Sequence, residues 1–209
     1  MNQIALSYAL TTSDRVKTRL GMTGTAFNVV LDAIIAGVTD LIEGECGGKR
    51  FLLTTYSNEV YTIFNANMKY LALNQAPVGT VTAVQYRAGL KSDPNWTDFN
   101  TDDWDLSEDG KSGLLRIWSI GGIEVNAIRV SYTAGYKIDF SNAGSPTAHT
   151  LPFDISDLAE RLTIKLFKKR EHEGKASESF EGGTVTWKEL IDEADKQIIA
   201  RHRRLPAFV

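Results

Sequence analysis

Apolar side chains recur at helical spacing near the start of the chain. Val16 and Leu20 lie four residues apart, after candidate N-cap residues at 12–14, and Gly21 follows as a stop signal. A longer stripe runs over 27–42, where an apolar residue returns every three or four positions. The pattern predicts a short helix followed by a long one, which glycines then end.

The spacing changes to two between residues 50 and 136, where β-branched and aromatic residues become frequent. Turn residues separate the alternating runs, and Ser57-Asn58 and Glu108–Lys111 are plausible hairpin corners. Short strands at this density predict a small antiparallel sandwich or barrel. The predicted strands are 51–56, 59–64, 70–73, 81–86, 114–118 and 127–132.

Helical spacing returns after residue 151. Asp154 or Ser156 can cap a helix that continues to Gly174, and a polar loop is expected over 174–183. Thr186-Trp187-Lys188-Glu189 has the form of a capping box, which predicts a last helix ending near Arg203.

The order of these zones predicts an α+β fold. Neither helical end has enough faces to bury its apolar stripe alone, so we expect the N- and C-terminal helices to form one small bundle. The strands between them would be an inserted antiparallel β domain. The expected ranges are 1–49 for the first helices, 50–150 for the β domain, 151–200 for the last helices and 201–209 for a C-terminal extension.

The net charge, the single cysteine and the length of the apolar runs exclude several classes of protein. The 209 residues carry a net charge of -3, so a general nucleic-acid binder, which is usually strongly basic, is not expected. Cys46 is the single cysteine and sits at a predicted helix end, where a small buried filler is the better interpretation than a reactive thiol. No apolar run is long enough for a membrane span, and no basic start precedes the first apolar residues. We expect a soluble protein made in a reducing cytoplasm, without cofactor or metal.

No catalytic motif frames the histidines or the cysteine, so we expect no enzyme and assign no catalytic residue. Asp98–Asp102 matches the first ligands of a calcium loop, but Asp103 stands where that loop needs glycine. An acidic hairpin that contacts a basic partner is the alternative to a merely solvated flank. Its acidic residues are Asp98, Asp102, Asp103, Asp105, Glu108 and Asp109.

Two basic clusters lie near predicted helix C-termini, where the helix dipole favours cations. One is Lys168, Lys169 and Arg170, and the other is Arg201–Arg204. The functional alternative is a basic patch that faces DNA or an acidic partner.

Several local motifs resemble one known family, the head-tail connector (adaptor, or head-completion) proteins of tailed double-stranded DNA bacteriophages. They occur in the family's order over about 9–170, and the most characteristic are Tyr132-Thr133-Ala134-Gly135-Tyr136 and Leu151-Pro152. The others are the opening helix at 13–21, the long helix ending at 40–51, and the segments 71–73, 76–78 and 81–84.

The resemblance implies a structural virion protein at the head-tail interface. It implies a homo-oligomeric ring, commonly of twelve subunits, bound beneath the portal protein and facing a tail-side connector or tail-terminator protein. DNA would pass through its channel without sequence-specific binding. On this interpretation a C-terminal extension docks on the portal, and it consists of Arg201, His202, Arg203, Arg204, Leu205, Pro206, Ala207, Phe208 and Val209.

Three other function classes are alternatives to this interpretation. A tail-terminator or tail-tube subunit would also form rings, but such proteins are dominated by β structure, whereas helices begin and end this chain. A hydrolase using Asp98, Asp102, Asp103 or Asp105 would need two carboxyl groups in one pocket, which a surface hairpin rarely provides. A sequence-specific DNA binder would need a recognition helix rich in Arg, Asn and Gln, and none is present.

Overall fold

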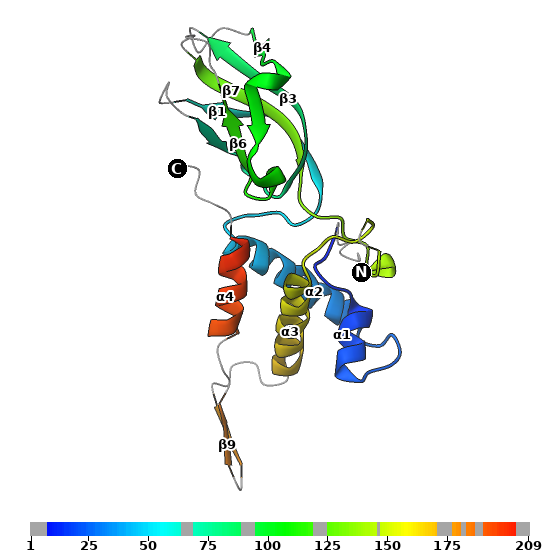
Figure 1. Ribbon diagram of the computed structural model, residues 1–209. Coiled ribbons are helices and arrows are strands. Elements are labelled where there is room, and N and C mark those ends of the chain that lie inside the picture. Colours follow the sequence, from blue (N-terminus) through cyan, green and yellow to red (C-terminus); the bar gives the residue numbers. More distant parts are fainter. Residues whose placement is uncertain are drawn as a thin grey trace. The chain divides into compact units, whose positions relative to one another are not determined.

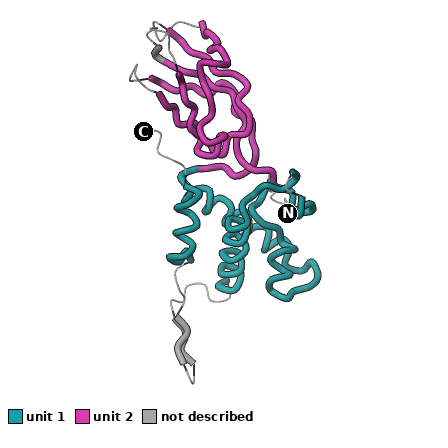
Figure 2. The backbone as a smooth tube through the Cα atoms, in the orientation of Figure 1, with its two compact units in different colours: residues 1–48, 138–203 teal, residues 49–137, 204–209 magenta. Residues whose placement is uncertain are grey.

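The computed structural model describes residues 8–63, 69–88, 95–118, 125–145, 147–170, 177–180, 183–186 and 190–203. These residues form two compact units, which Figure 2 distinguishes by colour. The first, called the helical unit below, contains the described residues of Met1–Gly48 and Ile138–Arg203. The second, called the sheet unit, contains those of Lys49–Lys137. Residues 138–150, which the sequence analysis places with the strands, belong to the helical unit.

The helical unit contains α1 (Ser13–Leu20), α2 (Asn28–Glu45), α3 (Phe153–Lys169) and α4 (Glu193–His202). Figure 1 shows α3 beside α2 and α4, and residues of both α1 and α4 contact α3. One buried cluster joins Val16 of α1, Leu31 and Ile35 of α2, and Phe167 of α3. Helices from the two ends of the chain therefore share a core, as the apolar stripes predict.

The first helices begin and end where the sequence indicates. The Thr12 hydroxyl accepts a hydrogen bond from the backbone N–H of Arg15 at 3.4 Å, and Gly21 closes α1 with a left-handed φ of 68°. Cys46 follows α2 and is fully buried. Its Sγ lies 3.8 Å from the Ile199 carbonyl oxygen of α4, which confirms the interpretation as a buried filler.

The sheet unit consists of two antiparallel sheets. One has the order β1-β7-β3-β4, and the other has the order β2-β6-β5. The strands are β1 (Thr54–Thr62), β2 (Tyr70–Ala72), β3 (Val78–Ala88), β4 (Thr97–Asp98), β5 (Trp104–Leu106), β6 (Leu114–Ile117) and β7 (Val125–Ala134). Short 3-10 turns occur at η1 (Thr101–Asp103), η2 (Ser107–Gly110) and, in the helical unit, η3 (Phe140–Asn142).

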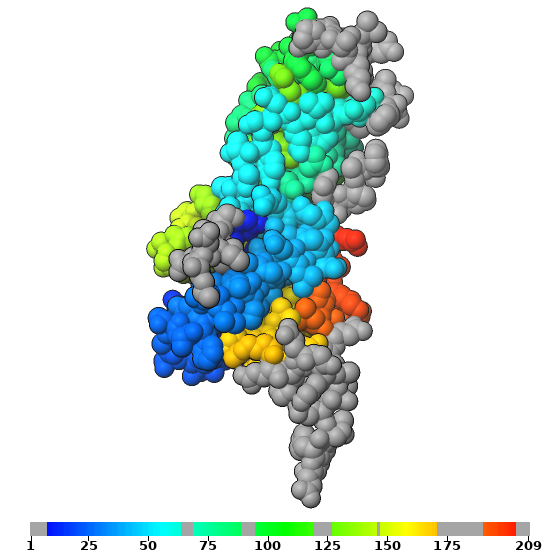
Figure 3. All heavy atoms as spheres, turned by 180° about the vertical axis from the view of Figure 1, so that it is seen from behind, coloured from blue at the N-terminus to red at the C-terminus, as the bar shows by residue number. Residues whose placement is uncertain are grey.

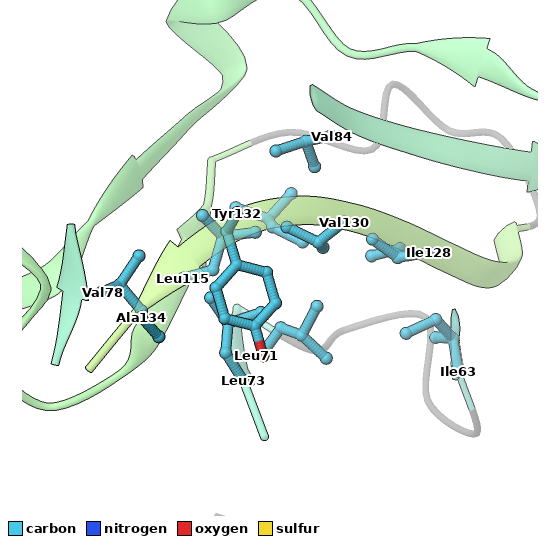
Figure 4. Close-up of a cluster of buried hydrophobic side chains, with 11 residues drawn as sticks. Ile63, Leu71, Leu73, Val78, Val84, Leu115, Ile128, Val130, Tyr132 and Ala134 are labelled. Carbon is cyan, nitrogen blue, oxygen red and sulfur yellow. The ribbon is translucent and has the colours of Figure 1, made fainter. Parts of the chain in front are cut away.

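Both sheets contribute to a single core, which makes the unit a small sandwich and confirms the α+β prediction. Leu71 and Leu115 come from the three-stranded sheet, while Val84, Val130 and Tyr132 come from the four-stranded sheet. Figure 4 shows the Tyr132 ring among these aliphatic side chains. Alternate residues of each strand thus face inward, as the period of two requires.

A carboxylate stands at one edge of this core. Glu59 accepts hydrogen bonds from the hydroxyls of Tyr61 and Tyr132 and from the Asn74 amide, the last at 2.6 Å. Burial, followed by the hydrogen bond to Glu59, raises the pKa of Tyr132 far above its ordinary value, and the same two causes raise that of Tyr61. Both tyrosines therefore stay neutral donors, and with Asn74 they satisfy the Glu59 carboxylate within the part of the chain that the structure describes.

The expected hairpin corner at Ser57-Asn58 is wrong. The chain continues through it as the single strand β1, because one extra residue forms a bulge between Tyr56 and Glu59 opposite β7. Asn58 adopts a left-handed φ of 57° there, and its N–H donates to the Ser131 hydroxyl at 2.9 Å. A bulge and a turn favour the same residue types, which explains the error.

Three predictions for the last zone are also wrong. Pro152 stands at the N-cap of α3 without a side-chain cap, whereas Asp154 and Ser156 lie inside the helix. The expected polar loop contains a two-stranded hairpin, β8 (Ser177–Phe180) with β9 (Gly183–Thr186). Thr186 ends β9 and so caps no helix; Trp187–Glu189 lie outside the described residues. The capping box is Asp192 with Asp195, and it opens α4.

The sheet unit is closed where the chain enters and leaves it. The Leu53 N–H donates to the Tyr136 carbonyl at 2.8 Å, and the Tyr136 N–H donates to the Phe51 carbonyl at 2.7 Å. Gly135, the residue before Tyr136, has a φ of 107°, and a Cβ added there would stand 2.5 Å from the Leu52 carbonyl oxygen. The glycine in the motif at 132–136 is therefore explained by the fold, since only glycine fits at position 135.

We predict that Gly135→Ala lowers the free energy of unfolding by at least about 2 kcal/mol, because the methyl group meets backbone and the φ is unfavourable. Urea denaturation measures the change. Gly144→Ala is the matched control, since its added Cβ meets no atom within 4 Å, and it should change stability by less than about 0.5 kcal/mol. Equal effects of the two substitutions would contradict the role of Gly135.

Candidate interaction surfaces

The basic residues at the end of α3 do not form one uniform patch. Lys168 and Lys169 are exposed, whereas Arg170 is half-buried. The Arg170 guanidinium lies 3.6 Å from the centre of the Phe167 ring and 5.3 Å from that of Phe27. It also donates to the Phe167 carbonyl at 2.8 Å, so it closes the helix end. Only the two lysines are presented outward for a partner.

The C-terminal basic residues are divided in the same way. Arg201 and Arg203 are exposed, while His202 is half-buried and its Nε2 lies 3.0 and 2.9 Å from the two carboxylate oxygens of Asp154. This contact fastens the end of α4 to the first turn of α3. The remaining predicted docking residues, 204–209, lie outside the described residues.

A groove of about 490 Å³ lies beside α4 in the helical unit. Figure 3 shows the surface of α4, in orange to red, next to the blue surface of α2. Apolar side chains from α2, from α4 and from the segment before α4 make most of the lining, and Arg203 stands at the end of the described chain beside it. The lining residues are Leu41, Glu45, Leu190, Ile191, Lys196, Ile199, Ala200 and Arg203.

A chain of ion pairs holds the helices that carry these surfaces. Arg19 of α1 pairs with Asp157 of α3 at 2.6 Å, and Asp157 pairs with Arg161 at 2.9 Å. Arg161 in turn pairs with Asp195 of α4, whose side chain is fully buried, and Lys165 reaches the same carboxylate at 2.9 Å. One line of alternating charges thus connects three helices.

The pKa shifts agree with this arrangement. Burial raises the pKa of Asp157, but the hydrogen bonds from Arg19 and Arg161 outweigh it, so the pKa lies below its ordinary value. Burial lowers the pKa of Arg161, and its hydrogen bonds to Asp195 and Asp157 more than reverse that effect. The backbone N–H of Asp195, followed by Lys165, lowers the pKa of Asp192 to about 2. Asp157, Arg161 and Asp192 are therefore charged near neutral pH.

The predicted acidic hairpin is divided between the two sheets and their connections. Asp98 lies on β4 and accepts a hydrogen bond from the Gln85 amide at 2.8 Å. Asp102 and Asp103 lie in η1, and Asp105 lies on β5. Glu108 and Asp109 form the exposed corner η2 that leads toward β6, so the predicted corner at Glu108–Lys111 is confirmed.

None of these carboxylates lines the groove described above. Asp98, Asp102 and Asp105 are exposed on the sheet unit, whereas the groove described above belongs to the helical unit. Within the described ranges, no group of three or more His, Cys, Asp or Glu side chains is placed to hold a metal ion. Among the helices that the structure describes, none has the length and apolar character that a membrane crossing requires.

The sequence analysis missed two surfaces on which arginines lie against aromatic rings. On the four-stranded sheet, Arg87 and Arg129 lie 5.0 and 4.6 Å from the centre of the Trp96 ring. On the three-stranded sheet, Arg116 lies 3.5 Å from the centre of the Trp118 ring and 5.8 Å from that of Tyr70. The available signal was the alternation in Leu114–Trp118, which places Arg116 and Trp118 on the face opposite Leu115 and Ile117.

We predict that Asp195→Asn lowers the free energy of unfolding by about 2 kcal/mol, because Arg161 and Lys165 lose their shared carboxylate. The loss is smaller than for a fully buried pair, since both cations keep contact with water. Thermal denaturation measures it. Glu193→Gln is the control on the same helix; it breaks only the exposed pair with Lys196 and should cost less than about 0.5 kcal/mol. If Asp195→Asn leaves the free energy of unfolding unchanged, the ion pairs of Asp195 do not stabilise the helical unit.

No protein-family model matches the chain, and no curated protein matches it. Solved structures do resemble it. One chain, described as "Neck of empty GTA particle computed with C6 symmetry", matches with a TM-score of 0.55 and 19% identity, over 99% of this chain and 96% of that chain. Another, described as "Neck of native GTA particle computed with C12 symmetry", matches with a TM-score of 0.50 and 18% identity, over 93% and 89%. At these identities the likeness establishes a shared fold.

Proposed function

We propose that this protein is a structural subunit of a virion neck, a head-tail connector of a tailed phage or a phage-like particle. The observation that carries the proposal is the fold likeness to a particle neck chain, which extends over 99% of this chain and 96% of the other. A match of almost the whole length includes both the helical unit and the sheet unit. The likeness therefore concerns the combination of the two units and not one common module.

The motifs that resemble the connector family support the same conclusion because they hold the fold. Tyr132 satisfies Glu59 in the sandwich core, and Gly135 and Tyr136 close the entrance to the sheet unit. Leu151 is buried, and Pro152 stands at the start of α3. Such residues maintain a scaffold, which is what a protein without catalytic function needs from its characteristic positions.

A ring is the assembly that we infer. The two neck structures that resemble this fold were computed with C6 and C12 symmetry, which favours a closed ring, with twelve subunits as the expected number. Each subunit of such a ring contacts its two neighbours through different surfaces. The ring would lie beneath the portal protein, with a tail-side connector or terminator below it, and would line part of the DNA channel.

The charges suit a channel that does not grip DNA. The net charge is -3, and at the end of α3 only Lys168 and Lys169 point outward as cations. Few phosphate contacts give weak, sequence-independent attraction, which allows DNA to pass. The segment Arg201–Val209 is proposed to dock on the portal, because it combines exposed arginines with the apolar residues Phe208 and Val209.

Particles assembled without this protein test the proposal. We expect DNA-filled or empty heads and separate tails, with joining restored by the wild-type chain but not by a chain whose Leu205–Val209 are replaced by five Gly or Ser residues. Electron microscopy counts the joined particles, and urea denaturation checks that the variant is folded. Normal joining without the protein would contradict the neck function, whereas normal joining with the replaced segment would contradict only the docking role of Leu205–Val209.

A further inference from the structure

An arginine between two aromatic rings covers the outer face of the three-stranded sheet. Tyr70 of β2, Arg116 of β6 and Asp105 of β5 are direct cross-strand partners, so their side chains share one face. The buried residues Leu71, Leu115 and Ile117 take the opposite face. Trp118 continues the outer row, and its N–H donates to the Asp103 carbonyl at 2.8 Å. We call Tyr70, Arg116 and Trp118 the aromatic-arginine face.

This face presents two large aromatic side chains to solvent. Trp118 is 54% exposed and Tyr70 is 41% exposed. Arg116 packs against both rings, and among the described residues no carboxylate lies within ion-pair distance of it. Trp, Tyr and Arg are the residues that most often supply the binding energy of protein interfaces, since they combine large area with a fixed polar group. The face has the composition of an interface centre.

The charge of the sheet unit is separated along the sequence. Residues 49–137 carry nine acidic and nine basic side chains, yet the stretch 98–110 has six acidic side chains and no basic one. Within this stretch Asp105 lies directly opposite Arg116, whereas Glu108 and Asp109 form a separate exposed corner before β6. Arg116 and this acidic corner have opposite charges and lie at different places on one unit, so they can pair between two copies in a head-to-tail orientation. The charge pattern therefore favours another copy of this chain as the partner.

The acidic corner lies at the far end of the same sheet. Glu108 and Asp109 come before β6 and Trp118 comes after it, and β6 alone spans about 13 Å. Both acidic residues are exposed, and the corner is fixed by Gly110, where an added Cβ would stand 2.3 Å from the Val78 carbonyl oxygen. The two surfaces thus occupy opposite ends of one rigid strand.

We propose that the aromatic-arginine face of one copy docks on the Glu108-Asp109 corner of the next copy, and that this contact is part of the subunit interface of the ring. Different surfaces at opposite ends of a sheet make a head-to-tail contact, which closes into a ring when the rotation permits. The inference rests on the proposed ring function.

A charge exchange tests the contact on heads that lack the protein. Arg116→Glu alone should reduce neck-bearing heads about tenfold or more, and so should Glu108→Lys combined with Asp109→Asn, since each variant places like charges together. Asparagine is chosen at 109 because it tolerates the left-handed φ of 52° there. An equal mixture of the two variants should restore necks to at least about half of the wild-type count, because alternating subunits pair opposite charges at every contact.

The mixture separates the possible failures. Urea denaturation first shows that each variant is folded. An Arg116 that contacts the portal and not its neighbour is not rescued by mixing, so absence of rescue with folded variants overturns the inference. Normal necks with Arg116→Glu alone overturn it as well. Arg87→Glu is the control, because this arginine also lies against a tryptophan but on the other sheet, and it should leave the neck count unchanged. If the wild-type chain adds no neck to the heads, the proposed function itself fails.

Discussion

The closure of the sheet unit is the constraint on which the rest of the fold depends. A domain inserted between two helices must return the chain to the place where it entered, and here the entering strand and the leaving strand are hydrogen-bonded to each other at Leu53 and Tyr136. Their approach is so close that the backbone of Leu52 occupies the space of a side chain at position 135. Because the entering and leaving segments are joined, the strands between them form a sandwich with a core of its own. The helices before and after this sandwich can then pack together.

The helical unit meets its own constraint with charges as well as apolar surface. Its helices come from opposite ends of the sequence, and an apolar stripe alone allows them to slide or rotate against one another. The ion chain from Arg19 through Asp157 and Arg161 to Asp195 offers one register in which these four charges, including the buried Asp195, are all paired. A buried charge left alone costs several kcal/mol, so we infer that the chain selects the arrangement of α1, α3 and α4 more than it adds stability.

Periodicity predicted the elements that have a continuous apolar face. The helices at 13–20, 28–45 and 153–169 and most strands of the sandwich follow from it, because one face of each is buried against a known kind of neighbour. The predictions of turns and helix caps were wrong where the same residue types suit two local structures. Ser57-Asn58 serves a bulge as well as a turn, and Asp192 with Asp195, not Thr186 with Glu189, caps the last helix.

The candidate surfaces were harder to predict for a related reason. Charged runs such as Lys168–Arg170 are visible in a sequence, but whether each side chain points outward depends on tertiary contacts, and Arg170 turns back onto Phe167. The aromatic-arginine face is made by residues 70, 116 and 118, which only the strand order β2-β6-β5 brings together. Pairing between distant strands is not encoded by local spacing.

The two units, each with its own internal support, suit a subunit that is built into a larger assembly and must keep its shape there. Its surfaces, more than any pocket, carry the proposed function. The most direct measurement of this account is electron microscopy of the purified protein, alone and mixed with heads that carry a portal. The account predicts closed rings, or a collar at the portal vertex of the heads. Monomers that bind neither one another nor the portal would contradict it.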